Sequence, residues 1–290
     1  MNYSEHEFAT TDGLNLYYRD YAGSAAKPPL LCLTGLTRNA KDYHDFASRL
    51  APGRRVLCLD YRGRGRSAYD PNWQNYQPPT YTGDVITMLT ALKLEKVLLV
   101  GTSLGGIVSM GLANMVPQLL AGVILNDIGP DLDNTGLGRI AGYVGNDTRM
   151  PDFVTAGRGL KAMFHGAYPD LPEARWTEFA ERIFVADPAR GDLRLNYDLA
   201  LAKPLQQQAE LQAKGEGPAF DLWPLYKGLR EIPTLAFRGG LSDLLTAATF
   251  DRMGDDMPRL TRITVPNRGH VPLLDEPECV AAIDAFLAHV

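Results

Sequence analysis

Short, unbroken apolar runs recur along the chain and are separated by segments of helical periodicity. These runs occupy residues 30–33, 56–59, 97–100 and 123–125, and two further strands are expected at residues 234–237 and 262–265. They are too short for helices, and they lack the polar alternation of a strand that faces water on one side. We therefore interpret them as strands buried on both faces, as in a parallel sheet with helices on either side. Near the start, residues 5–10 and 14–20 flank Asp12-Gly13, a dipeptide typical of a β-hairpin turn.

Helical spacing of apolar residues marks the segments between these strands. The segments are residues 39–51, 80–92, 247–253 and 277–289. Asn39 is expected to cap the first of them, and Pro277 suits the first turn of the last. The hairpin and these six strands together predict an α/β fold with a mostly parallel eight-stranded sheet.

The alternation of strands and helices is interrupted after the sixth strand. Residues 130–229 carry helical patterns at 137–144, 152–164, 173–185 and 197–211, without a strong strand pattern. We predict an all-helical cap at 130–229, inserted into a core formed by residues 1–129 and 230–290. The large aromatic residues of this insertion are expected to build its interior and, in part, the roof of a pocket for an apolar group. They are Tyr143, Phe153, Phe164, Trp176, Phe179, Phe184, Tyr197 and Trp223.

Composition narrows the class of protein. The chain has 290 residues, 45% of them hydrophobic, with a net charge of -5 and no conspicuous basic run, so nucleic acid and anionic membranes are not expected partners. The first residues lack the pattern of a signal peptide, and no apolar run is long enough to span a membrane. Three scattered cysteines suit a reducing compartment, so a cytoplasmic enzyme is expected. Neither a metal nor another cofactor is expected, because metal-ligand spacings and a phosphate-binding loop are lacking.

The segment 97–115 carries the strongest chemical signal. An apolar strand is followed by Gly101-Thr102-Ser103-Leu104-Gly105 and then by an apolar helix. G-x-S-x-G between a strand and a helix is typical of a nucleophile elbow, a sharp turn that exposes the serine hydroxyl. The glycines are needed because the strand and the helix approach each other closely there. We therefore predict Ser103 to be a nucleophile.

A serine hydroxyl needs a base, and that base needs an orienting acid. Of the five histidines, only His270 lies in a loop directly after a core strand, where sites form in open parallel sheets. Asp243 follows the penultimate strand by a short loop and is the expected acid. Asp127, at another strand end, is the alternative acid.

Asp60 also ends a strand, but the Gly/Arg loop that follows indicates a structural carboxylate that fixes this loop. The loop carries Arg62, Arg64 and Arg66, which we expect to be solvated and ion-paired.

Several motifs give the chain a resemblance to the α/β-hydrolase family, specifically to members with a helical cap. They are D-Y-R-G-R-G-R-S (60–67), G-T-S-L-G-G (101–106), N-D-I-G-P (126–130), L-R-L-N-Y-D (193–198), R-G-G-L-S-D (238–243) and G-H-V-P-L-L-D-E-P-E (269–278). The resemblance implies the triad Ser103, Asp243 and His270. It also implies an oxyanion hole formed by the backbone N–H groups of Leu36 and Leu104. The family usually has histidine where this chain has Thr34.

A serine nucleophile argues against the epoxide hydrolases and haloalkane dehalogenases of this fold, which use a carboxylate. The sequence therefore predicts a serine hydrolase that cleaves small-molecule carboxylic esters, lactones included, with an apolar moiety. A carbon–carbon bond hydrolase or a perhydrolase of the same fold stays open as an alternative, and a ligand receptor without activity is a further one.

Overall fold

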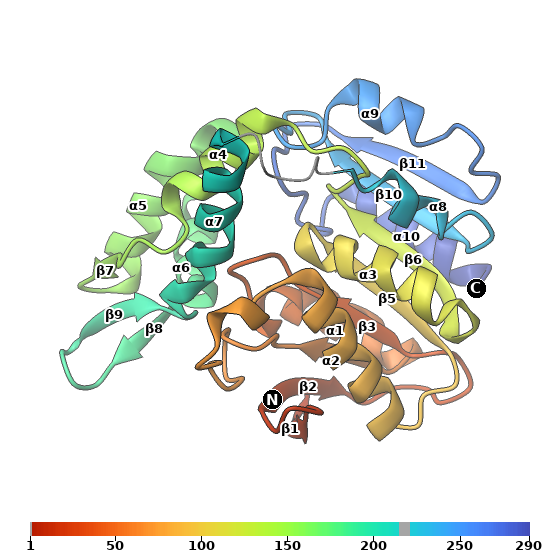
Figure 1. Ribbon diagram of the computed structural model, residues 1–290, viewed down its shortest axis with the longest axis horizontal. Helices are drawn as coiled ribbons and strands as arrows, with labels where there is room; N and C mark the ends of the chain where they lie inside the picture. The colour runs from red at the N-terminus through yellow and green to blue at the C-terminus, as the bar shows by residue number, and fades with distance from the viewer. Residues whose placement is uncertain (1, 215–220) are drawn as a thin grey trace.

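An eight-stranded sheet runs through the centre of the molecule (Figure 1). The computed structural model describes residues 2–214 and 221–290. The strand order is β1-β2-β4-β3-β5-β6-β10-β11, and only the pairs β1–β2 and β2–β4 are antiparallel. The strands are β1 (Ser4–Ala9), β2 (Asn15–Tyr21), β3 (Leu30–Leu33), β4 (Val56–Leu59), β5 (Val97–Thr102), β6 (Leu120–Asn126), β10 (Thr234–Gly239) and β11 (Leu260–Val265). The mostly parallel eight-stranded sheet and the N-terminal hairpin are therefore confirmed.

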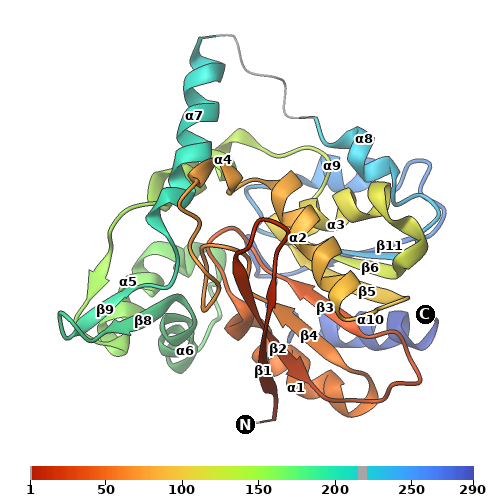
Figure 2. The ribbon, with the colours of Figure 1, turned by 60° about the horizontal axis from the view of Figure 1, so that its bottom comes forward.

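Helices cover both faces of this sheet, as the unbroken apolar strands require. One face packs on α1 (His44–Leu50) and α10 (Pro277–Ala288) through Phe46 and Ile283. The other packs on α2 (Pro78–Ala91), α3 (Leu104–Met115), α8 (Trp223–Lys227) and α9 (Ala247–Arg252) (Figure 2). Short 3-10 turns occur at Ala40–Tyr43, Ala51–Gly53, Trp73–Asn75, Pro117–Leu119, His165–Ala167 and Leu199–Leu201.

The expected helix at 39–51 begins as a 3-10 turn before it continues as α1. The Asn39 side chain accepts a hydrogen bond from the Lys41 N–H, so the predicted cap at Asn39 is confirmed. No helix among the described residues is long and apolar enough to cross a membrane.

The segment between β6 and β10 forms a separate layer at one side of the sheet (Figure 1). Its helices are α4 (Asn134–Tyr143), α5 (Phe153–Phe164), α6 (Glu173–Ile183) and α7 (Ala202–Ala213), close to the four predicted segments. We call α4–α7 and the strands between them the cap. Its interior includes Trp176 and Phe184, both buried, whereas Trp223 lies outside it on α8.

The prediction that the cap is all-helical is wrong. It also contains a three-stranded sheet in the order β7-β9-β8, formed by β7 (Arg149–Met150), β8 (Phe184–Asp187) and β9 (Asp192–Leu195). The expected helix at 173–185 ends two residues early because Phe184 enters a hairpin that turns at Gly191, where φ is +74°. Arg149 pairs with Asp187 and Asp192 and so ties the three strands together.

The turn from β5 into α3 brings backbone within contact of backbone. A Cβ atom added at Gly101 would lie 2.5 Å from the carbonyl oxygen of Gly105, and one added at Gly105 would lie 2.0 Å from that of Leu33. Neither neighbour is a side-chain end that could move aside. Both glycines of the G-x-S-x-G pattern are therefore required by packing.

We expect Gly105→Ala to lower the free energy of unfolding by about 3 kcal/mol, because the added methyl group overlaps the Leu33 carbonyl. Urea unfolding followed by circular dichroism measures this change. The matched control is Gly83→Ala in α2, where a Cβ atom meets open space. It should raise stability by about 0.5–1 kcal/mol. Equal stability of the two variants would contradict the packing argument.

Candidate active site

Ser103 occupies the turn between β5 and α3 in a strained conformation. Its backbone has φ +51° and ψ -116°, in the left-handed half of conformational space that L-residues avoid at a cost of about 1–3 kcal/mol. The turn is held by the Ser103 N–H, which donates to the Asn126 carbonyl at 3.1 Å, and by the Gly106 N–H, which donates to the Ser103 carbonyl at 2.8 Å. Such strain at an exposed hydroxyl is typical of a nucleophile elbow.

His270 lies within hydrogen-bond distance of Ser103. The Nε2 atom of His270 is 2.9 Å from the Ser103 Oγ, and its Nδ1 is 2.7 Å from the Asp127 Oδ2. The imidazole side chain is 9% exposed and the Asp127 side chain is fully buried. The structure thus places hydroxyl, imidazole and carboxylate in one hydrogen-bonded line, although they are far apart in sequence.

The acid in this line is Asp127, which follows β6 directly. Its Oδ1 accepts the Gly239 N–H at 2.7 Å, and its Oδ2 also accepts the Ser242 hydroxyl at 2.6 Å. Its own N–H donates to the Phe237 carbonyl at 2.9 Å. Two donors besides His270 therefore hold this buried carboxylate in place and compensate for its removal from water.

The expectation that Asp243 partners His270 is corrected by the structure. Asp243 instead makes a bidentate ion pair with Arg139 on α4, at 2.5 Å and 2.8 Å. The Arg139 guanidinium lowers the pKa of Asp243. Asp127 and Asp243 both follow strand ends, so their spacing in sequence could not separate them. The deciding partner, Arg139, comes from the cap, 104 residues away.

The loop after β3 passes beside Ser103. A Cβ atom added at Gly35 would lie 3.8 Å from the Ser103 Cβ, and the Leu36 carbonyl accepts a hydrogen bond from the Arg64 Nε at 2.7 Å. Neither the Leu36 N–H nor the Leu104 N–H donates to a group in the described part of the chain. Both amides are available as donors, in agreement with the expected oxyanion hole, which stays a prediction.

Thr34 has a structural part in this loop. Its hydroxyl donates to the Arg38 carbonyl at 3.2 Å, and the Arg38 N–H donates to the Gly35 carbonyl at 3.1 Å. Threonine therefore closes the loop on itself where the family's usual histidine is missing.

The arginine loop after β4 contains the expected ion pairs, at Arg62 and Arg66, but it is not the predicted solvated cluster. Only Arg66 is exposed, whereas Arg62 is buried in a network with Asp12, Asp70 and Asp84. The network could not be read from the sequence because its carboxylates lie on three other segments.

Arg64 is fully buried and has no carboxylate partner among residues 2–214 and 221–290. Its guanidinium faces the rings of Tyr61, Tyr76 and Tyr81, which supply cation–π attraction. Its backbone also forms an isolated antiparallel bridge with Tyr197 of the cap. Arg64 thus contacts both the loop beside Ser103 and the cap.

Asp60 has the predicted structural part. Its carboxylate accepts the backbone N–H groups of Ala40 at 2.5 Å and Arg66 at 2.9 Å, so it holds the arginine loop against the 3-10 turn that precedes α1. Burial raises the pKa of Asp60 to about 6.

The His270 loop is fastened to the cap and to the core. The Tyr168 hydroxyl contacts both the carbonyl and the N–H of Val271 at 2.9 Å. The Gly269 N–H donates to the Ala167 carbonyl at 2.7 Å, and the Asn126 side chain donates to the Pro272 carbonyl at 2.9 Å. These bonds hold the residues on both sides of His270 and so fix the direction of its imidazole.

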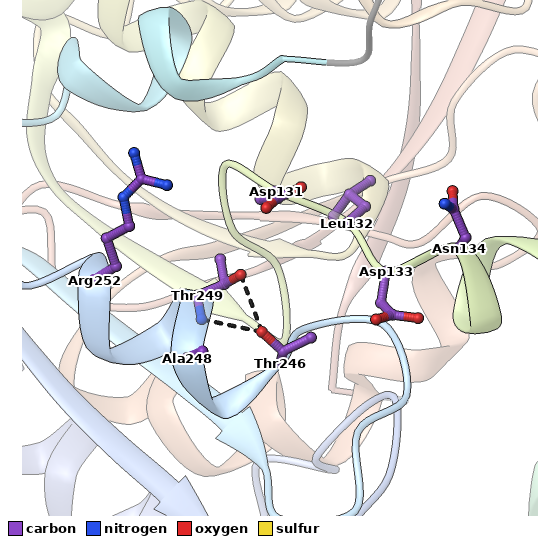
Figure 3. A pocket seen from close by; sticks show the side chains of 8 residues that line it. All are labelled: Asp131, Leu132, Asp133, Asn134, Thr246, Ala248, Thr249 and Arg252. Carbon is purple, nitrogen blue, oxygen red and sulfur yellow. Dashed lines mark hydrogen bonds between the residues drawn. The ribbon is translucent and has the colours of Figure 1, made fainter.

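A hollow of about 450 Å³ lies next to the segment that leads from β6 into the cap (Figure 3). Asp131, Asp133 and Arg252 border it, and the Thr246 hydroxyl at its edge accepts the Thr249 N–H at 3.0 Å as a helix cap. The lining does not include Ser103, Asp127 or His270, so this hollow is separate from the hydrogen-bonded line.

Comparison with known proteins points to one family. A sequence model described as the Alpha/beta hydrolase family matches residues 30–283. The chain is 33% identical to a 3-hydroxybutyrate-oligomer hydrolase of Cupriavidus necator, over 93% of this chain and 91% of that protein. It is 27% identical to a 2-(acetamidomethylene)succinate hydrolase of Mesorhizobium japonicum, over 90% of this chain and 88% of that protein.

Among solved structures, an α/β hydrolase from Novosphingobium aromaticivorans superimposes with a TM-score of 0.93. It is 40% identical, over 100% of this chain and 99% of that one. The match extends through both the sheet and the cap.

We expect Asp127→Asn to lower kcat/KM on a neutral ester by about 10³- to 10⁴-fold, because the amide cannot hold the imidazole in the required tautomer. Asp243→Asn should lower it by less than about tenfold, because Asp243 contacts Arg139 rather than His270. Initial-rate kinetics of the two variants side by side test the assignment. The reverse order of effects would restore Asp243 as the acid.

Proposed function

Because the chain belongs to the alpha/beta hydrolase family, we propose that it hydrolyses carboxylic esters through an acyl-enzyme formed on Ser103. The observation that carries this proposal is the continuous line from Ser103 through His270 to Asp127, with distances of 2.9 Å and 2.7 Å. These are the distances needed for a base to take the serine proton and for an acid to orient that base.

In the proposed reaction, the Ser103 Oγ attacks the ester carbonyl while His270 Nε2 takes its proton. Negative charge develops on the carbonyl oxygen, which the Leu36 and Leu104 N–H groups stabilise as donors preorganised in the fold. Collapse of the tetrahedral intermediate breaks the bond to the alcohol, and His270 gives that alcohol its proton. The acyl group is then bound to Ser103.

Water completes the cycle by the same route. His270 removes a proton from a water molecule that attacks the acyl carbonyl, and it returns the proton to Ser103 as the acid leaves. Asp127 stabilises the imidazolium that forms in each half of the reaction and keeps the Nδ1 proton directed toward itself. The donors from Gly239 and Ser242 keep the carboxylate in position throughout.

The substrate class that we propose is a small ester with an apolar moiety, lactones included. The 3-hydroxybutyrate-oligomer hydrolase of Cupriavidus necator supports an ester, since hydroxy-acid oligomers are joined by ester bonds. A panel of p-nitrophenyl esters, assayed beside a vinylogous diketone, separates ester cleavage from carbon–carbon cleavage. Lack of turnover on both would favour a binding protein of the same fold.

We expect Ser103→Ala to fold normally and to lose about 10⁴-fold or more in turnover of a p-nitrophenyl ester, because the nucleophile is gone. It should also lose covalent labelling by a fluorophosphonate probe, measured by the mass of the intact protein. The control is Ser24→Ala, an exposed serine in the loop between β2 and β3, which should label as the parent protein does. Labelling of Ser103→Ala would refute Ser103 as the nucleophile.

A further inference from the structure

We propose that Arg38 and Arg139 form a carboxylate-binding site beside Ser103, so that the preferred substrates are esters that carry a free carboxylate close to the scissile bond. This inference rests on the proposed ester hydrolysis and specifies its substrate class. Arg38 comes from the loop after β3, and Arg139 comes from α4 of the cap. The site is therefore assembled between core and cap.

Arg38 lies next to the nucleophile. A Cβ atom added at Gly35 would be 3.5 Å from the Arg38 Cγ and 3.8 Å from the Ser103 Cβ, so both side chains pass close to Gly35. The Nε and Nη2 atoms of Arg38 each bind one Asp42 oxygen at 2.6 Å. Its Nη1 has no hydrogen-bond partner in the part of the chain that the structure describes, and 28% of the side chain is accessible.

Arg139 repeats this arrangement from the other side. Its Nε and Nη2 atoms bind the two Asp243 oxygens, and the Tyr143 hydroxyl is a further hydrogen-bonding neighbour of its guanidinium. About a third of the side chain is accessible, at 33%. In both arginines a carboxylate occupies the side edge of the guanidinium, and the end edge formed by Nη1 and Nη2 binds no carboxylate of the described residues and can take one from a ligand.

The two arginines share one aromatic neighbour. Tyr143 lies one helical turn after Arg139 on α4 and stacks edge-on against Phe164. Burial raises the pKa of Tyr143, and the Arg139 and Arg38 guanidinium groups act to lower it. The ion pairs place Arg139 near the hydrogen-bonded line, because its partner Asp243 directly follows Ser242, whose hydroxyl donates to Asp127.

Tyr168 closes the same space on the side of the catalytic base. Its hydroxyl is bound to the backbone of Val271, the residue after His270. Burial raises the pKa of Tyr168, and Arg38 acts against this rise. The Arg38 side chain beside Gly35 and Ser103 and the Tyr168 hydroxyl beside His270 therefore flank the hydrogen-bonded line from the core and from the cap.

A carboxylate fits this site better than other anions. The free end edge of a guanidinium is a planar fork that matches two carboxylate oxygens. Each arginine already has one carboxylate partner, so its charge is balanced before a ligand binds. One further negative charge is tolerated with favourable hydrogen bonds, whereas a phosphate dianion adds repulsion from Asp42 and Asp243.

The test compares two forms of one substrate: the dimer of 3-hydroxybutyrate with a free carboxylate, and the same dimer capped as an N-methyl amide. Each has a single ester bond of the same kind. We expect kcat/KM to be at least about 30-fold higher for the free acid, mainly through a lower KM. The loss of one charge-assisted bidentate contact is expected to change kcat/KM by about this factor.

Two double variants remove each ion pair as a unit, so that no unpaired carboxylate is left behind. In Arg38→Met/Asp42→Asn and in Arg139→Met/Asp243→Asn, the ratio of free acid to amide should fall below about three. The matched control is Arg49→Met/Asp284→Asn, a pair between α1 and α10 at 2.7 Å that lies far from Ser103. It should keep the parent ratio.

A binding measurement on the parent protein tests the carboxylate site even if the double variants do not fold or the protein does not turn over an ester. Butyrate and butyramide are titrated against the parent protein by ligand-observed NMR, and butyrate should bind at least about tenfold more tightly. Equal binding, or equal turnover of acid and amide, would overturn the carboxylate site while ester hydrolysis stands. Preferential butyrate binding without turnover of any ester would instead contradict the proposed reaction and retain the site.

Discussion

A fully buried carboxylate at Asp127 is the constraint on which the arrangement of the candidate site depends. A charge without water must be compensated by donors, and this one receives the Gly239 N–H, the Ser242 hydroxyl and the His270 imidazole. These donors come from β10, the loop after it and the loop after β11. The carboxylate therefore joins three chain segments at the end of the sheet and sets where the imidazole lies relative to Ser103.

The loop after β10 consequently makes two different sets of contacts. Its backbone and Ser242 hold the acid that β6 supplies, and its Asp243 reaches in the other direction to Arg139 on the cap. Neighbouring residues 242 and 243 thus connect this loop to the candidate acid and to the cap, respectively. This division explains why a loop with an aspartate in the family's usual place need not provide the acid.

The parts of the molecule that could be predicted from sequence are those encoded by local periodicity and close packing. Unbroken apolar runs identified the buried strands, and the glycines around Ser103 identified the turn, because a Cβ atom at Gly105 would lie only 2.0 Å from a backbone oxygen. His270 followed from its place after the last strand.

The choice between Asp127 and Asp243 could not be made, since it depends on an arginine from the cap. The cap strands were missed because they are only two to four residues long, and because Phe184 and Val185 of β8 continue the helical pattern that precedes them. The burial of Arg62 and Arg64 depends likewise on partners far along the chain.

Arg64 makes the cap and the loop beside Ser103 mechanically dependent on each other. One side of this residue binds the Leu36 carbonyl, and its backbone bridges to Tyr197, while the adjacent Gly65 N–H donates to the Asn196 carbonyl at 2.9 Å. A bulky ligand that displaced the cap outward would also displace Arg64. Through the bond to the Leu36 carbonyl, this movement would reorient the peptide groups next to Ser103. A larger ligand would then lower kcat as well as weaken binding. The cap would respond to the size of the ligand and would not only cover the site.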